Sequence, residues 1–332
     1  MGIKAKERLL TVLIIVAIAG LLFVVGYPIY KESLPSHVRF GVDKSLNSLP
    51  FYVALMDTTR DYFALEKVEA EFVDITGDPL EGVKNGDYDI AVVPWYWLII
   101  SPSTDGDTVK AFGSVEIRSS RSMDAFFVPE GSKISRLRDL SGKRIGYLSR
   151  DEYLVNLLMA QLAEALELKQ VKYVSMSAEQ LMRAFEDKTA DVLFVLEPYR
   201  SYLLYTGAVA LAEGLLSAYV VPTIPYGAIV MRKNFVTVEH RTAATRVKKA
   251  VEAALSHMAR NPELAKRLLL QLNSMPGDGE IITGMRAAEY QRLSEISVKN
   301  IENLQTELVK RGIGTCGIKP TEFLFQKIDF GM

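Results

Sequence analysis

Residues 38–93 read VRFGVDKSLNSLPFYVALMDTTRDYFALEKVEAEFVDITGDPLEGVKNGDYDIAVV, and this stretch decides the fold. Its short apolar runs have the length and β-branched content of buried strands, whereas the segments between them are spaced as helices. Strands that alternate with helices indicate parallel βαβ units. The predicted strands are Val38–Val42, Ala70–Ile75 and Asp89–Val93.

The helices predicted between these strands have ordinary start and stop signals. The first runs from about Leu49 to Phe63, with Ser48 as its N-cap and Pro50 in its first turn. The second, Pro79–Asn85, is short and ends at an Asn-Gly pair.

The same pattern restarts after a polar crossover. A long amphipathic helix is predicted over Asp151–Glu167 and a shorter one over Ala178–Phe185. The chain then returns through the proline-rich segment Val221–Tyr226 into a strand at Ala228–Met231, and continues almost wholly as helix to about Arg311. Further strands are predicted at Val109–Glu116, Ala125–Val128, Lys143–Leu148, Val171–Ser175, Asp191–Leu196 and Ala208–Ala212.

Two such sets, with the chain crossing between them twice, predict an α/β fold of two lobes joined by a two-segment hinge. Lobe 1 comprises residues 38–117 and 219–332, and lobe 2 comprises residues 118–218. A hinge of this kind permits closure around a ligand.

The N-terminal residues predict a membrane anchor. From Leu9 to Tyr30 there are 22 residues without a charge, and a helix of that length reaches roughly 33 Å, enough for the hydrocarbon layer. Basic residues cluster before this run, which places residues 1–8 in the cytoplasm, residues 9–30 in the membrane, and the linker 31–37 and both lobes outside.

A cleaved signal peptide is the alternative interpretation of the same run. The segment Ala17-Ile18-Ala19 offers a small-x-small cleavage pattern, but the apolar run continues past it. No cysteine lies near the end of the run, which excludes a bacterial lipoprotein anchor. Both interpretations send the lobes across the membrane.

Composition excludes several other classes of protein. The chain has 39 Lys and Arg against 40 Asp and Glu, so it lacks the basic surplus of a nucleic-acid-binding protein. Its single cysteine, Cys316, excludes an internal disulfide and a cysteine-rich metal site. No catalytic or phosphate-binding motif is present, and the three histidines are isolated. No cofactor or metal is therefore expected.

The order of the motifs resembles the nitrate, sulfonate, taurine and thiamine-precursor class of ABC-transporter substrate-binding proteins. In lobe 1 the resemblance rests on the pair Tyr62-Phe63 and on GDYDIA at 86–91; in lobe 2 it rests on DLSGKRIG at 139–146 and on Glu197-Pro198-Tyr199 with the Thr-Gly pair that follows. It covers about Val38 to Ala265.

This resemblance implies a type II periplasmic-binding-protein fold, a ligand in the cleft between the lobes, and a permease and an ATPase as partners. By the same analogy the protein is expected to be a monomer. One departure concerns the loop after the first strand of lobe 2. It reads Leu148-Ser149-Arg150-Asp151 where the class has glycine and small residues, so the ligand chemistry is open.

Open α/β sheets bind ligands beyond the carboxyl ends of their strands, and this rule selects the site candidates of lobe 1. Asn47 and Ser48 follow the first strand, although Ser48 suits a plain N-cap equally well. Trp95 and Tyr96 follow the third strand and are expected to face the ligand, with Trp97 in the core.

The crossover and lobe 2 supply the remaining candidates. The guanidinium groups of Arg118 and Arg121 would bind an anion, or the two residues would only form a solvated hinge. At the start of the long helix an anion would be stabilised by the helix end, but the acids Asp151 and Glu152 also fit a cationic ligand. The other candidates are Ser149, Arg150, Glu197, Tyr199 and Tyr226.

The sequence therefore predicts an extracytoplasmic solute-binding protein that captures a small anionic or aromatic solute and is not an enzyme. Two alternatives remain open, because the same fold also hosts enzymes. One is an enzyme acting on a small metabolite; the other is a membrane-tethered receptor without a transport role.

Overall fold

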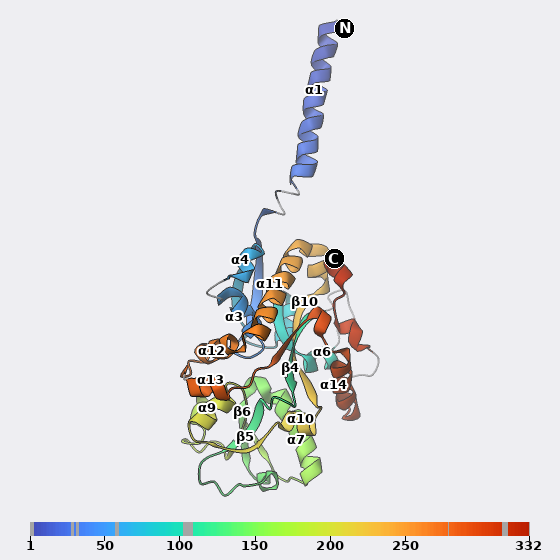
Figure 1. Cartoon of the computed structure of the whole chain (residues 1–332). Helices are drawn as coiled ribbons and strands as arrows, with labels where there is room; N and C mark the ends of the chain where they lie inside the picture. Colours follow the sequence, from blue (N-terminus) through green and yellow to red (C-terminus); the bar gives the residue numbers. More distant parts are fainter. Residues whose placement is uncertain are drawn as a thin grey trace.

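A computed structural model of the chain describes residues 3–27, 30, 33–56, 60–101, 109–277, 279–313 and 318–331. Figure 1 shows a body of two lobes, one above the other, with the N-terminal helix α1 (Ile3–Leu21) extending away from the upper lobe. A π-helical turn, η1 (Leu22–Gly26), continues it. Within the described ranges, no helix combines the length and the apolarity needed to cross a membrane.

Lobe 1 is built on a six-stranded sheet in the order β11-β4-β10-β3-β1-β2. The strand β1 pairs in parallel with β2 and β3, as the βαβ pattern predicts, and β10, β4 and β11 are added antiparallel. The strands are β1 (Ser36–Val42), β2 (Val68–Asp74), β3 (Ile90–Pro94), β4 (Val109–Arg118), β10 (Thr223–Arg232) and β11 (Glu289–Arg292).

Lobe 2 repeats this design in a five-stranded sheet of order β7-β6-β8-β5-β9. Here β6 pairs in parallel with β7 and β8, and β5 and β9 are antiparallel. The loops after β1 and β6 are thus equivalent points of the two lobes. The strands are β5 (Asp124–Val128), β6 (Arg144–Leu148), β7 (Lys172–Met176), β8 (Val192–Leu196) and β9 (Val209–Glu213).

The same ion pair ties the first and third parallel strands in both lobes. Arg39 of β1 donates its backbone N–H and its guanidinium to Asp89, the residue before β3. Arg144 of β6 makes the equivalent bonds to Asp191, the residue before β8. The aspartate of the motif at 86–91 is therefore explained by strand alignment.

Helices cover the sheets of both lobes, and α11 packs against α3, α4 and β11 on lobe 1. The helices are α3 (Leu49–Met56), α4 (Tyr62–Leu65), α5 (Pro79–Asn85), α6 (Trp95–Ile100), α7 (Glu152–Leu166), α8 (Ala178–Arg183), α9 (Tyr199–Tyr205), α10 (Leu215–Tyr219), α11 (Arg241–Arg260), α12 (Pro262–Leu272), α13 (Gly279–Gly284) and α14 (Val298–Lys310). Shorter helical turns are η2 (Leu137–Leu140), η3 (Ser149–Asp151), η4 (Phe235–Glu239), η5 (Leu293–Glu295), η6 (Pro320–Phe323) and η7 (Lys327–Phe330).

The core of lobe 1 forms where the first helices meet β1. The side chain of Phe40 is fully buried, and its ring lies 5.1 Å from that of Phe51 and 4.8 Å from that of Phe63. These rings join the strand to α3 and α4. Burial of each such side chain stabilises the fold by roughly 1.5–3 kcal/mol.

Two predicted elements differ from the structure. The helix expected from Leu49 to Phe63 is divided, because Asp61 is extended and its carboxylate caps the new helix α4 by accepting the Ala64 N–H at 2.9 Å. The strand β11 lies where only helix was expected. Its four polar residues lack strand periodicity, and only pairing with the edge of β4 makes them a strand.

Some sequence predictions fall outside the described residues. They concern parts of the predicted anchor and linker at 28–29 and 31–32, and residues 57–59 of the predicted first helix. Cys316 also lies outside them.

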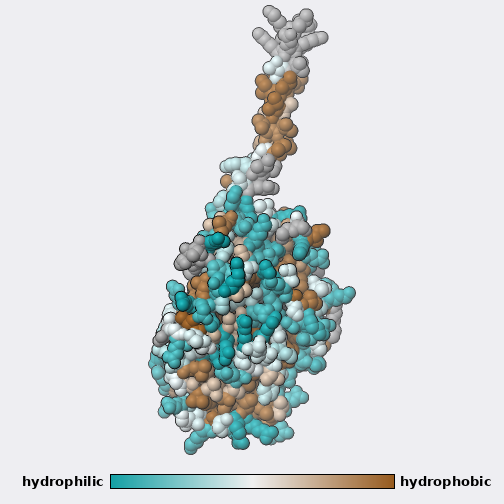
Figure 2. Space-filling view, in the orientation of Figure 1, coloured by the Kyte–Doolittle hydropathy of each residue, from teal (hydrophilic) through white to brown (hydrophobic). Residues whose placement is uncertain are grey.

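The space-filling view in Figure 2 shows apolar side chains gathered on the projecting α1 and η1, and a mainly hydrophilic surface over lobe 1. The exposed apolar side chains of the N-terminal segment include Val12, Ile15, Leu21 and Phe23.

Candidate functional site

The loop after β1 is held in one conformation by the carboxylate of Asp43. Its Oδ1 accepts hydrogen bonds from the hydroxyls of Ser45 at 2.6 Å and of Ser48 at 2.8 Å. The hydroxyl of Ser48 accepts the backbone N–H of Asp43 at 2.9 Å, and that of Ser45 accepts the backbone N–H of Asn47 at 3.1 Å. The loop is therefore prearranged at the carboxyl end of the sheet, where α/β folds bind ligands.

The side-chain oxygen of Asn47 in this loop accepts no hydrogen bond from the described residues. The residue is 9% exposed, and its Oδ1 is buried without a hydrogen-bond partner among the described residues. It lies against the backbone of Gly227, where an added Cβ would come within 2.3 Å of Oδ1. A buried amide oxygen without a partner costs free energy, so a ligand that donates a hydrogen bond here would be stabilised.

Lobe 2 contributes Arg150 and Asp151 from the equivalent loop after β6. Asp151 is 2% exposed, and its Oδ1 accepts the hydroxyl of Tyr226 at 3.2 Å. Because Tyr226 belongs to β10 of lobe 1, this bond joins the two lobes. The guanidinium carbon of Arg150 lies 5.8 Å from the ring centre of Tyr199, within cation–π range.

The carboxylate of Asp43 is near enough to act electrostatically on Arg150 and Asp151. Desolvation is the largest effect on Arg150 and lowers its pKa, but Asp43 and then Asp151 outweigh it, so the pKa is raised overall. Burial raises the pKa of Asp151 to about 6; Arg150 and the Tyr226 hydroxyl act in the opposite direction, and Asp43 adds to the rise. The site thus combines one cation with two carboxyl groups.

Aromatic rings form a further wall. Tyr96, at the start of α6, lies 5.3 Å from Tyr153 of α7 between ring centres. The hydroxyl of Tyr153 is buried and has no hydrogen-bond partner within the described ranges. Tyr199 donates its hydroxyl to Oδ1 of Asn273 at 2.9 Å, and Asn273 in turn donates to the Lys44 carbonyl at 2.9 Å. This second bridge also runs from lobe 2 to the loop after β1.

Six of the predicted site residues therefore come together between the lobes. They are Asn47, Ser48, Tyr96, Arg150, Tyr199 and Tyr226. Five are placed elsewhere.

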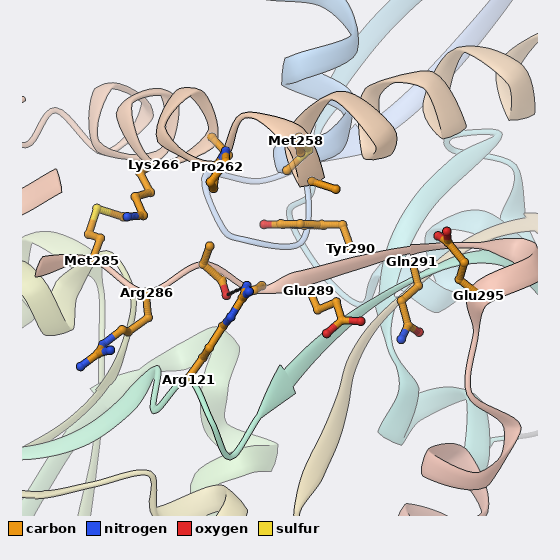
Figure 3. Close-up of a pocket in the computed structure, with 14 residues that line it drawn as sticks. Arg121, Met258, Pro262, Lys266, Met285, Arg286, Glu289, Tyr290, Gln291 and Glu295 are labelled. Carbon is orange, nitrogen blue, oxygen red and sulfur yellow. Dashed lines mark hydrogen bonds between the residues drawn. The ribbon is translucent and has the colours of Figure 1, made fainter. Parts of the chain in front are cut away.

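The two hinge arginines lie at the edge of lobe 1. Arg118, at the end of β4, pairs with Glu289 of β11. Arg121 donates to the Ala287 carbonyl at 3.3 Å and lines a separate pocket beside the hinge, shown in Figure 3. Neither has a contact with Arg150 or Asp151 in the described structure.

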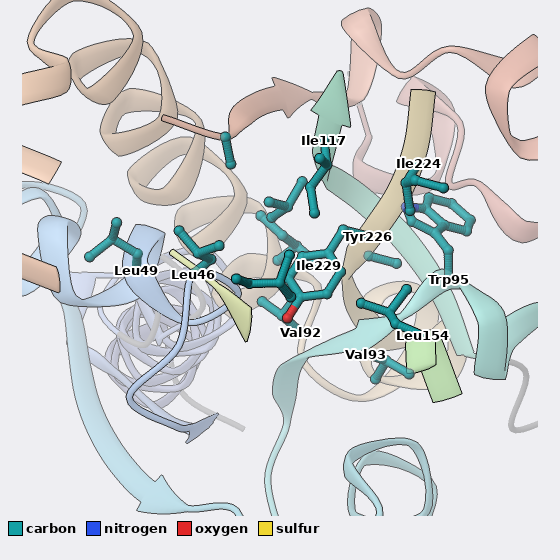
Figure 4. Packing of buried hydrophobic residues seen from close by; sticks show 14 of the residues in the cluster. Leu46, Leu49, Val92, Val93, Trp95, Ile117, Leu154, Ile224, Tyr226 and Ile229 are labelled. Atoms are coloured by element: carbon teal, nitrogen blue, oxygen red, sulfur yellow. The ribbon is translucent and has the colours of Figure 1, made fainter. Parts of the chain in front are cut away.

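Trp95 does not face the site as the sequence predicted. Trp95 is fully buried and donates its indole N–H to the Ser114 hydroxyl at 2.9 Å, whereas Trp97 is only partly buried. Figure 4 shows Trp95 packed beside Ile224 within the apolar cluster. The reason is helical geometry, because the first residue of α6 turns back onto the sheet while Tyr96 projects outward.

Ser149 and Glu197 have structural partners. The Ser149 hydroxyl donates to the Met176 carbonyl at 3.2 Å and accepts the Ser175 hydroxyl at 2.8 Å, so it faces β7. The Glu197 carboxylate is 2% exposed and accepts from Ser201 and Arg200, and from the backbone N–H of Arg286 at 3.0 Å.

Three residues that lie between the lobes were not among the site residues predicted from the sequence: Asp43, Tyr153 and Asn273. Asp43 carried a usable signal, since it directly follows the first strand. Tyr153 lies one turn into the long helix, and Asn273 follows a helix far along the chain. Among the described residues, no group of three or more His, Cys, Asp or Glu side chains is placed to hold a metal ion.

A family description matches most of the body of the chain. The family is "NMT1/THI5 like", and the match runs over residues 45–265. None of the curated proteins matches the chain.

Solved structures show the same two-lobed periplasmic-binding-protein fold. The alkanesulfonate-binding protein SsuA from Xanthomonas axonopodis pv. citri, bound to MOPS, is 18% identical with a TM-score of 0.65, covering 88% of this chain and 99% of that one. The periplasmic aliphatic sulphonate-binding protein SsuA from Escherichia coli is 15% identical with a TM-score of 0.62, covering 89% and 99%. The desulfurization enzyme DSZB, at 14% identity and a TM-score of 0.63, covers 89% and 98%.

Proposed function

The chain belongs to the NMT1/THI5-like family and has the two-lobed fold of solute-binding proteins, and from this premise we propose that it captures a small solute in the interlobe cleft and delivers it to the permease and ATPase of an ABC importer. One observation carries the proposal. The Tyr226 hydroxyl of lobe 1 bonds Asp151, and Tyr199 lies beside Arg150, in the loop after β6 that is equivalent to the loop after β1.

The charge of the cleft favours an aromatic solute over a fully ionised acid. Arg150 already faces Asp43 and Asp151, so little positive charge is left for an anionic ligand. The rings of Tyr96, Tyr153 and Tyr199 offer flat apolar contact. The unpaired Asn47 oxygen accepts from an N–H or O–H donor on the solute.

A binding role is supported over catalysis by the content of the cleft. Among the described residues that meet there, the hydroxyls of Tyr199 and Tyr226 are engaged in hydrogen bonds across the lobes. The Ser48 hydroxyl and the Asp43 carboxylate are held together within their own loop. The enzyme DSZB has the same fold, so turnover of a bound solute is the outcome that would replace this proposal.

Membrane anchoring outside the cytoplasm belongs to the same proposal. Its support is the run of 22 uncharged residues from Leu9 to Tyr30 and the basic residues before it. Alkaline carbonate extraction of membranes tests it. Retention of the full-length chain in the pellet is expected, and release of a shortened chain into the soluble fraction would instead support cleavage near Ala19.

The binding function is tested by a thermal-shift screen of the chain against neutral, cationic and anionic aromatic solutes and simple anions. A ligand at a hundred times its Kd adds about 2.7 kcal/mol of stability, which raises Tm visibly. Neutral or cationic aromatic hits are expected. Tyr96→Ala should abolish them, and Arg138→Ala, a substitution of an exposed arginine of lobe 2, should not.

The outcomes separate the alternatives. Hits confined to simple anions would overturn the aromatic preference while keeping the binding function. The absence of any hit in a broad panel, or conversion of a hit to product, would count against a transport protein.

A further inference from the structure

A second pocket lies beside the hinge. It has a volume of about 620 Å³, within the range of small-molecule sites. Its walls come from the ends of α11 and α12, from the crossing between β4 and β5, and from the segment that leads into β11. Figure 3 shows Met258, Pro262 and Lys266 on the helical side, Arg121 on the opposite side, and the ring of Tyr290 between them.

The apolar part of this pocket suits a flat organic body. Met258 and Met285 are 2% and 3% exposed, and the ring of Tyr290 is partly buried beside them. Thioether and aromatic groups together make an adaptable apolar contact. Tyr290 is held in place, because its hydroxyl donates to the Leu46 carbonyl at 3.1 Å.

The charged side chains that line the pocket leave an excess of positive charge. The two carboxylates, Glu289 and Glu295, are each paired with an arginine, Arg118 and Arg292. Both of these arginines lie outside the lining.

The positively charged side chains of the lining differ in whether a carboxylate pairs with them. Lys266 pairs with Glu263 at 2.9 Å. Arg121 has only the 3.3 Å bond to the Ala287 carbonyl, and the exposed side chain of Arg286 makes no polar contact with any described residue. Two guanidinium groups of the lining are thus not paired with a carboxylate of the described residues. Guanidinium groups bind carboxylates and sulfonates by paired hydrogen bonds.

We propose that this hinge pocket is a second binding site, distinct from the interlobe cleft, which takes a small organic acid with an aromatic or aliphatic body. Arg121 and Arg286 supply the positive charge that attracts the acid group, and the body lies on Tyr290 between the two methionines. Occupation also acts on the cleft, because Tyr290 holds Leu46, the neighbour of both Ser45 and Asn47. Coupling between two sites is reciprocal, so a cleft ligand also changes the affinity of the acid.

The test uses the full chain and ligand-observed ¹⁹F NMR with 4-fluorobenzenesulfonate as the probe. Its neutral analogue, 4-fluorobenzenesulfonamide, has the same ring and nearly the same shape. The sulfonate is expected to bind at least about tenfold more tightly than the sulfonamide, because it alone forms charge-assisted hydrogen bonds.

Substitutions test which residues bind the sulfonate. Arg286→Ala removes an exposed side chain and is expected to fold; alone it should weaken sulfonate binding several-fold, and with Arg121→Ala by at least about tenfold. Arg138→Ala, a substitution of a matched exposed arginine, should leave the affinity unchanged.

Three results would overturn the inference. They are no saturable sulfonate binding at millimolar concentration, loss of binding in Arg150→Ala with retention in Arg286→Ala, and equal affinity for the sulfonate and the sulfonamide. The second result would assign the probe to the cleft.

Discussion

Asp151 joins the two lobes through a carboxyl group that is almost completely removed from water. Its only hydrogen-bond donor among the described side chains is the Tyr226 hydroxyl, and Arg150 is its nearest source of positive charge. Burial disfavours the ionised form more than these neighbours favour it, so the pKa of Asp151 rises from 3.8 to about 6. Folding therefore prefers the protonated carboxyl.

This preference predicts a pH dependence with a definite sign. The stabilisation by protonated Asp151 is fully present below about pH 4 and is lost as the pH rises through 6, with an upper limit of about 3 kcal/mol. Asp151→Asn cannot titrate. Its free energy of unfolding relative to wild type should therefore increase between pH 4 and pH 7, as measured by urea denaturation at both values.

The buried Asp124 also has a pKa of about 6, but it titrates in both proteins and cancels in the comparison. A difference between Asp151→Asn and wild type that is the same at both pH values would contradict the argument.

Gly227 owes its identity to a close approach. An added Cβ would lie 2.3 Å from Oδ1 of Asn47 and 2.8 Å from a methyl group of Val92. Gly227→Ala should therefore lower the free energy of unfolding by about 1–3 kcal/mol, since overpacking displaces well-packed neighbours. Gly77→Ala is the matched control, because nothing lies within 4 Å of its Cβ position. Equal effects of the two substitutions in chemical denaturation would refute the assignment.

Among the secondary-structure elements, α9 depends most visibly on a side chain outside it. Glu197 precedes the helix and accepts the Ser201 backbone N–H at 3.2 Å and its hydroxyl at 3.0 Å. The same carboxylate accepts the backbone N–H of Arg286, in the segment leading to β11. It therefore connects lobe 2 with the chain that returns along the hinge.

Removal of this carboxylate should be costly. Glu197→Ala leaves the buried Arg200 and two backbone N–H groups short of an acceptor, and is expected to destabilise the fold by about 3–5 kcal/mol. Glu186→Ala, an exposed glutamate of the same lobe, should change stability by less than about 0.5 kcal/mol. Guanidinium denaturation of both variants measures the difference, and a loss below 1 kcal/mol for Glu197→Ala would argue against a structural role.

The two lobes are held together by bonds that run across the cleft. The hydroxyl of Tyr199 reaches Asn273, and that of Tyr226 reaches Asp151. Hydrogen bonds between the lobes favour the closed arrangement. A ligand that contacts both lobes shifts the equilibrium between open and closed forms in the same direction. The closure of the lobes should therefore be tunable at these two hydroxyl groups.

Tyr199→Phe tests this directly, because it keeps the ring beside Arg150 and removes only the hydroxyl. Loss of one hydrogen bond should shift the lobes toward opening and weaken a cleft ligand by about threefold to tenfold. Small-angle X-ray scattering without ligand should show a larger radius of gyration than in wild type. Tyr202→Phe, in the same helix, is the control. An unchanged radius together with unchanged affinity would mean that this bond does not govern closure.

The sequence by itself determined the local structure and the class of fold. Strand and helix periods are read over a few residues, so the βαβ units, the two sets and the loops after β1 and β6 were predictable. The rule that ligands meet the carboxyl ends of strands then led to Asn47, Ser48, Arg150 and Tyr226. The same local reading missed β11, whose four residues form a strand only beside β4.

Only the tertiary structure decided which of these side chains meet. Tyr226 and Asp151 are 75 residues apart in the chain, and Tyr290 and Leu46 are 244 apart. The buried position of Trp95, the opposition of Asp43 to Arg150 and the hinge pocket all depend on such distant pairs. No local pattern encodes them, because they arise from how the two sheets and the returning C-terminal helices pack against each other.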